Sequence, residues 1–141
     1  ELHQGQLPDL SFGEFEPRTL LELALDNAVE GCVFETFSAL RILRQAQKAT
    51  DSVIAQTLNS IAKDECNHAE LSWDIHRYLM TKLSNEEQTL VQKAQKEAVI
   101  KIGTASNNIS QLSIEEQELL GVEETNLLRE VFIQNWKKLA V

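Results

Sequence analysis

Hydrophobic and polar positions recur with a helical period along most of this chain. From Arg18 to about Ala49, and from the Thr50–Ser52 junction to about Lys82, apolar side chains lie three and four residues apart, as on one face of an α-helix. Shorter stretches with the same period end near Gly103 and Leu139. The pattern predicts an all-α protein built on two long helices.

Local signals predict where the helices begin and end. The polar Thr50–Ser52 junction is suited to cap the second helix. Ser84 with Glu87, and Ser113 with Glu116, have the spacing of capping boxes, and Gly121 is suited to stop a short helix. A last amphipathic helix is expected over 124–139, with Leu127, Leu128, Val131, Phe132, Ile133 and Trp136 as its packing residues.

The N-terminal stretch differs from the rest of the chain. Glu1–Pro17 contains both prolines and shows no sustained period, so we interpret it as an extended arm preceding a helical domain over 18–141. The chain begins at Glu1 without a methionine, and we expect that a segment upstream was removed.

A carboxylate occupies the middle of the apolar stripe of the second helix. At about 100° per residue, the apolar or small residues within roughly 40° of Glu65 are Ile54, Leu58, Ile61, Ala69, Ser72 and Leu79. His68 borders the same stripe, about 60° away. An unpaired charge is costly to bury there, and a metal ion would supply the counter-charge. A lone Glu-x-x-His is common by chance, but one aimed into a helical core is the motif of di-iron and di-manganese bundles, and these donors suit iron or manganese.

Two residues compete to supply the second carboxylate from the first helix. By wheel position Glu30 shares a face with Phe34 and Phe37, whereas Glu35 lies about 140° away. By height Glu35 is favoured, because it and Glu65 are each about 15 residues, roughly 22 Å, from the junction between the helices. We rank Glu30 first and keep Glu35 as the alternative, or as a further ligand of the same group.

One more histidine shares the stripe. His76 lies eleven residues after Glu65, roughly 16 Å along the helix, which is too far for the same metal ion. We expect a hydrogen-bonded histidine in the core or at its rim.

Composition narrows the functional classes. A net charge of −9 argues against a nucleic-acid surface, and no run of 18 or more apolar residues is present to span a membrane. The two cysteines, Cys32 and Cys66, make no disulfide framework. The cellular compartment is left open, with the cytoplasm favoured.

Two motifs together resemble a known family. Glu30–Thr36 (EGCVFET) and Ile61–Trp73 (IAKDECNHAELSW), with the spacing between them, are similar to the bacterial ferritin-like domain proteins. The resemblance implies a four-helix bundle with a carboxylate-bridged di-iron or dimetal site. It implies that Glu30 is the Glu ligand of the first helix, Glu65 the bridging Glu and His68 the imidazole ligand, with Asp64 orienting a ligand histidine.

The chain matches only the second half of that family's domain, which has two halves of this kind. Neither Glu97 nor Glu130, on the later helices, belongs to a Glu-x-x-His motif. One half-site offers too few ligands for two metals. We therefore expect a half-bundle completed by a second copy in a homodimer, or by an upstream half of the same protein. A relic bundle without metal is the remaining alternative.

The expected function follows from the resemblance. It is a ferritin-like dimetal protein that uses iron or manganese, with oxidase or ferroxidase chemistry as its activity. The competing class is a non-catalytic helical module for interaction or structure that binds no metal.

Overall fold

The computed structural model describes residues 17–104, 112–122 and 126–139, and all regular structure in these ranges is helical. The helical segments are α1 (Leu20–Asp26), the π-helical segment η1 (Asn27–Glu35), α2 (Thr36–Lys48), α3 (Ser52–Met80), α4 (Asn85–Thr104), α5 (Ile114–Leu120) and α6 (Asn126–Leu139). The prediction of an all-α protein is confirmed for the described residues. The predicted arm falls outside them, except for Pro17.

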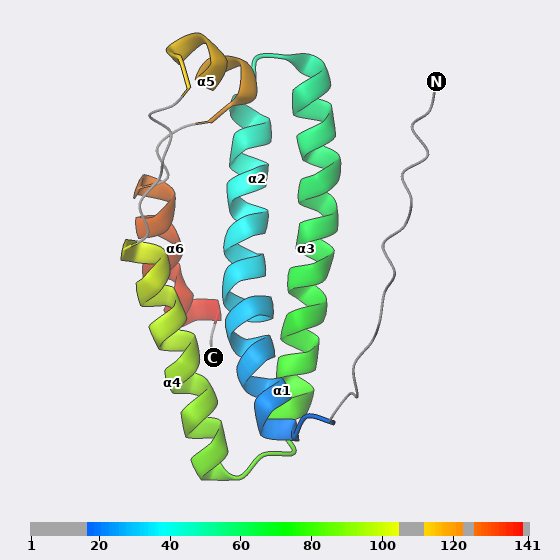
Figure 1. Ribbon diagram of the computed structural model, residues 1–141, viewed down its shortest axis with the longest axis vertical. Helices are drawn as coiled ribbons and strands as arrows, with labels where there is room; N and C mark the ends of the chain where they lie inside the picture. Colours follow the sequence, from blue (N-terminus) through cyan, green and yellow to red (C-terminus); the bar gives the residue numbers. More distant parts are fainter. Residues whose placement is uncertain (1–16, 105–111, 123–125, 140–141) are drawn as a thin grey trace, which may run out of the picture.

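The first three segments follow one another without a break and form one long helix, hereafter the first helix (Leu20–Lys48). Figure 1 shows α3 running antiparallel beside it, and α4 and α6 on the opposite side. The short α5 lies at the end where the first helix turns into α3. The first helix is therefore central. None of the helices in the described ranges has the length and apolarity to cross a bilayer.

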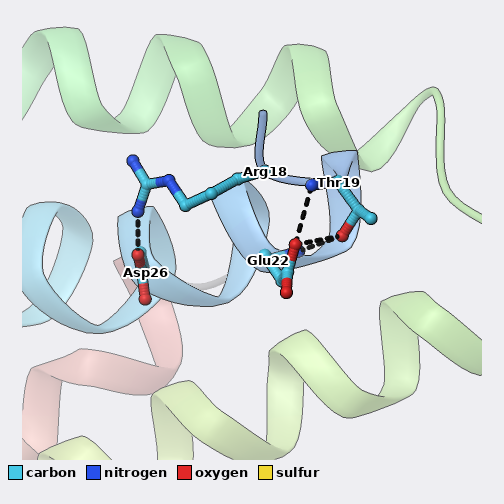
Figure 2. Close-up of polar contacts among 4 residues, drawn as sticks. All are labelled: Arg18, Thr19, Glu22 and Asp26. Atoms are coloured by element: carbon cyan, nitrogen blue, oxygen red, sulfur yellow. Dashed lines mark hydrogen bonds and ion pairs between the residues drawn. The ribbon is translucent and has the colours of Figure 1, made fainter. Parts of the chain in front are cut away.

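The start of the first helix is held by short-range polar contacts, which Figure 2 shows. The Thr19 hydroxyl accepts a hydrogen bond from the Glu22 backbone N–H at 3.2 Å, and the Glu22 carboxylate accepts one from the Thr19 backbone N–H at 2.7 Å. This reciprocal pair is a capping box, and it satisfies N–H groups that the first turn leaves free. Arg18 also forms an exposed ion pair with Asp26.

The predicted caps of the later helices are confirmed. The Asp51 carboxylate accepts hydrogen bonds from two backbone N–H groups of the first turn of α3, each at 2.9 Å. The pairs Ser84–Glu87 and Ser113–Glu116 make the expected reciprocal bonds. Gly121 ends α5 with a φ of 67°, in the left-handed region where glycine is favoured.

The main core lies between the first helix and the pair α4 and α6. It contains Cys32, Val33, Ala98, Val99, Ile102, Phe132 and Trp136. A second cluster, near the start of the first helix, contains Ala24, Ala28, Leu79, Leu83 and Val91. The prediction for the last helix was partly wrong. Phe132 and Trp136 are buried, but Leu127, Val131 and Ile133 remain exposed, because the described neighbours cover only one narrow side of α6.

Small side chains bring the first helix and α3 close together. Ala62 and Ala69 are among the few buried residues of α3, and both buried residues of α2 are alanines. The approach is tight at Gly31, where an added Cβ would lie 2.6 Å from the Ser72 Oγ and 2.9 Å from the Asn27 Oδ1. Such distances are shorter than real van der Waals contacts, so a side chain there would push the helices apart.

Gly31→Ala should therefore lower the free energy of unfolding by about 1–2 kcal/mol, because overpacking outweighs the gain of about 0.5–1 kcal/mol from replacing a helical glycine. Urea unfolding followed by circular dichroism measures the change. Gly103→Ala is the matched control, since its Cβ would meet only the terminal Cδ1 of Ile133, which can rotate away. Equal stability of Gly31→Ala and the unaltered chain would contradict the tight approach.

Candidate metal centre

The π-helical segment changes which side chains of the first helix share a face. Hydrogen bonds in η1 span five residues instead of four, so each turn takes in more of the chain. Glu30 and Glu35 are five residues apart inside this segment and lie roughly one turn above each other. In a regular α-helix the same pair would be about 140° apart. Such segments are often found at functional sites.

Three side chains with metal-binding atoms come together between η1 and α3. Glu35, Glu65 and His68 each offer one ligand atom, and these atoms all lie within 4.8 Å of one another. Glu35 ends η1, while Glu65 and His68 are one turn apart on α3. The two carboxylates are half-buried and the imidazole is exposed, so the group is open to solvent on the His68 side. We call these three residues the Glu–Glu–His group.

The two carboxylates of the group interact directly. A hydrogen bond between the Glu35 and Glu65 carboxyl groups raises the pKa of Glu35, and partial burial and the negative charge of Glu65 raise it further. The charge of His68 acts in the opposite direction, and the charge of Glu30 adds to the increase. When two carboxylates lie this close, their mutual repulsion raises the pKa of one of them. A divalent cation would favour ionisation of both.

The structure brings three of the four predicted ligands together and leaves the fourth outside the group. The group is formed by Glu65, His68 and Glu35, which was the alternative for the first helix. Glu30, which was ranked first, is exposed and lies beside the group. Glu30 remains close enough to influence Glu35 electrostatically. The ranking of Glu30 depended on a wheel drawn at α-helical pitch, which does not hold through η1.

Polar contacts next to the group fix α3 against the first helix. The Asn27 side-chain amide donates a hydrogen bond to the Ser72 carbonyl at 2.9 Å, and the Cys32 thiol donates to the same oxygen at 3.5 Å. On α3, the Ser72 hydroxyl donates to the His68 carbonyl at 2.9 Å. Burial raises the pKa of Cys32 to about 12, so this thiol is protonated at neutral pH. Asn27 and Cys32 therefore position the site and were not singled out from the sequence, since their role depends on a contact 40 to 45 residues away.

His76 differs from the prediction of a hydrogen-bonded histidine. It is half-buried and meets the Trp73 ring edge-on at 5.7 Å, but its Nδ1 has no hydrogen-bond partner among the described residues. Burial lowers its pKa, so the neutral ring is favoured. Trp73 instead donates to the Thr36 hydroxyl at 3.1 Å, which adds a second link between α3 and the first helix.

A groove lies between the start of the first helix and the end of α3, on one side of the group. Its volume is about 750 Å³, and its walls are mainly apolar. It is lined by Arg18, Leu20, Leu23, Asp26, Asn27, Glu30, Gly31, Asp74, Ile75, Tyr78 and Leu79. Glu30 thus belongs to the groove and also influences the group electrostatically.

The later helices add nothing to the group. Glu97 is exposed and lies 3.9 Å from Lys93 in an ion pair on α4, and Glu130 is exposed on α6. The described residues therefore define a helical protein with one Glu–Glu–His group between two antiparallel helices. No protein-family model, curated protein or solved structure matches the chain. Its function has to be inferred from these residues and their geometry.

The raised pKa of Glu35 predicts the pH dependence of stability without metal. A carboxyl group with a higher pKa in the folded chain contributes stability below its ordinary pKa of 4.5, and this contribution is lost as the pH rises through the folded value. Glu35→Gln mimics the protonated form at every pH. The variant should therefore have a higher free energy of unfolding than the unaltered chain at pH 7, and a similar one near the ordinary pKa.

Urea unfolding with a chelator present, at both pH values, measures this difference. Glu70→Gln is the control, because Glu70 is exposed on α3 and lies away from the group. A Glu35→Gln variant that is less stable than the unaltered chain at pH 7 would show that the carboxylates do not repel each other.

Proposed function

We propose that this chain is a ferritin-like dimetal carboxylate protein in which Glu35, Glu65 and His68 bind iron or manganese. The observation that supports the proposal is the approach of three ligand atoms, from two adjacent helices, to within 4.8 Å of one another. Carboxylate with imidazole is a donor set that suits these metals. The resemblance of the EGCVFET and IAKDECNHAELSW motifs to ferritin-like proteins supports the same class.

The negative charge of these residues suits a cation, and so does the chemistry of their ligand atoms. A hydrogen bond to Glu65 raises the pKa of Glu35, so this carboxyl group keeps its proton more readily than a free glutamate does. A divalent cation can take the place of that proton and neutralise both charges. Glu30 is the next carboxylate outward, and a second cation would draw on it. Asn27 and Cys32 hold the two ligand-bearing helices in register through the Ser72 carbonyl.

The proposed activity is an oxidation, either of ferrous iron as substrate or of a small molecule. Iron held by these residues would supply one-electron chemistry with dioxygen. The role of the chain is to keep the carboxylates in a partly buried position, where they compensate a change in positive charge. Exposure of the imidazole leaves a path for reactants, and the apolar groove at Glu30 leaves room for a substrate.

The alternative function is a helical interaction module without metal. It is favoured by the exposed large apolar residues of α3, which suit binding to another protein surface. Metal binding distinguishes the two functions, because an interaction module has no need of it.

Removal of any ligand should abolish metal binding. Glu35→Ala, Glu65→Ala and His68→Ala should each weaken Mn²⁺ binding by at least about 100-fold, because each removes one of three protein donors. Glu30→Ala should weaken it by about tenfold or less, as expected for a neighbouring charge. Isothermal titration calorimetry measures the affinities, and circular dichroism checks that the helices persist.

Glu70→Ala is the control and should bind Mn²⁺ like the unaltered chain. Failure of the unaltered chain to bind either Mn²⁺ or Fe²⁺ would overturn the metal site. Loss of binding in Glu30→Ala together with retention in Glu35→Ala would assign the ligand to Glu30.

Oxidase chemistry has a separate readout. The chain loaded anaerobically with Fe²⁺ should consume dioxygen faster than the same amount of free Fe²⁺, and Glu65→Ala should not accelerate consumption. An oxygen electrode measures both rates. Tight iron binding without acceleration would support a metal-binding protein but contradict an oxidase.

A further inference from the structure

The exposed apolar residues of α3 form a single stripe. Its five exposed large hydrophobic residues, with 39% to 70% of their surface accessible, are Val53, Ile61, Leu71, Ile75 and Tyr78. At about 100° per residue all five lie within about 50° of one line along the helix, and His68 lies within the same range. This line is about 140° away from the buried Ala62 and Ala69, which mark the side nearest the first helix. The third buried residue, Leu79, lies at the end of α3, about 50° from the line. We call it the outer stripe.

Apart from Val53, the outer stripe follows the heptad spacing of a helix that pairs with another helix. One set of positions recurs every seven residues, and a second set follows it three residues later: Ile54, Ile61, His68 and Ile75, then Thr57, Asp64, Leu71 and Tyr78. These are the a and d positions of a coiled-coil seam. In the described structure the seam has no helix on it, since α3 lies at the edge of the bundle (Figure 1).

The seam is symmetric about the middle of α3. Positions 54 and 78 are its ends, and their midpoint is residue 66, which is also the midpoint of α3 (Ser52–Met80). An antiparallel copy related by a two-fold axis at the level of residue 66 would place Ile61 opposite Leu71 of the second copy. It would also place Asp64 opposite His68 of the second copy, a carboxylate facing an imidazole. Apolar pairs would lie on both sides of this polar centre.

The length of the outer stripe suits a helix pair. The seam extends over most of α3, which has 29 residues and is about 43 Å long, so a second copy of α3 can contact it along most of its length. The apolar groove beside Ile75 and Tyr78 would receive the opposite end of α3, where Val53 is exposed.

We propose that a second copy of this chain docks antiparallel on the outer stripe, about a two-fold axis at the level of residue 66, and contributes Asp64 to the Glu–Glu–His group. Glu65 and His68 are one and two residues from the axis, within about 3 Å along the helix. The two groups therefore adjoin, and each copy brings three carboxylates: Glu35, Glu65 and Asp64. Because these negative charges repel one another, a divalent cation that neutralises them would favour the dimer. This consequence rests on the proposed function.

Analytical ultracentrifugation with Mn²⁺, and with a chelator, tests the dimer and its link to metal. We expect a dimer at micromolar concentration with Mn²⁺, and at least tenfold weaker association without it. Leu71→Glu should be monomeric with unchanged helix content, because Leu71 is exposed. Leu90→Glu is the matched control, since Leu90 is exposed to a similar extent on α4 but lies outside the stripe, and it should remain a dimer.

Disulfide trapping tests the orientation. In a Cys66→Ser background, Ile61→Cys combined with Leu71→Cys should oxidise to a covalent dimer. Leu71→Cys alone should not, because the two copies of position 71 would be about 15 Å apart along antiparallel helices. Trapping of the single variant would indicate a parallel pair and overturn the proposed axis.

The outcomes separate this proposal from the proposed function. A monomer that binds Mn²⁺ through Glu35, Glu65 and His68 would overturn the dimer and leave the metal site intact. A dimer that forms equally with chelator and binds no metal would support the docking but overturn both the metal link and the metal site. A monomer without metal would overturn both proposals.

Discussion

The close contact between the first helix and α3 is the constraint on which the site depends. Gly31 and the buried alanines allow the two backbones to approach, and the Ser72 carbonyl receives donors from the first helix at the same level. With bulkier side chains at this contact, Glu35 and Glu65 would be held too far apart to interact directly. The packing of the two helices therefore holds two carboxylates close together, at a cost in free energy. This proximity determines the chemistry of the site.

Much of the fold could be predicted because its signals are local. Helical period, capping boxes and a C-terminal glycine act within a few residues, and they correctly predicted the long helices and the caps at Asp51, Ser84 and Ser113. The extent of burial on α6 could not be predicted in the same way. It depends on which neighbours cover each side, and the sequence pattern does not specify them.

The site could be predicted only in part. Glu65 and His68 belong to one regular helix, so their spacing alone places them together. The choice between Glu30 and Glu35 depends on a change in backbone hydrogen bonding that leaves no trace in the order of apolar and polar residues. Height along the helix was the better guide to which carboxylate lies near Glu65, because height is less sensitive to helical pitch than the direction of a side chain.

The π-helical segment also changes the direction in which side chains point along the first helix. Since each residue of η1 turns the chain less than an α-helical residue does, everything from Thr36 onward is rotated relative to everything before Asn27. The two ends of the first helix can therefore present unrelated sequence positions to the same neighbour. A single wheel drawn over the whole helix therefore superimposes two faces that point in different directions.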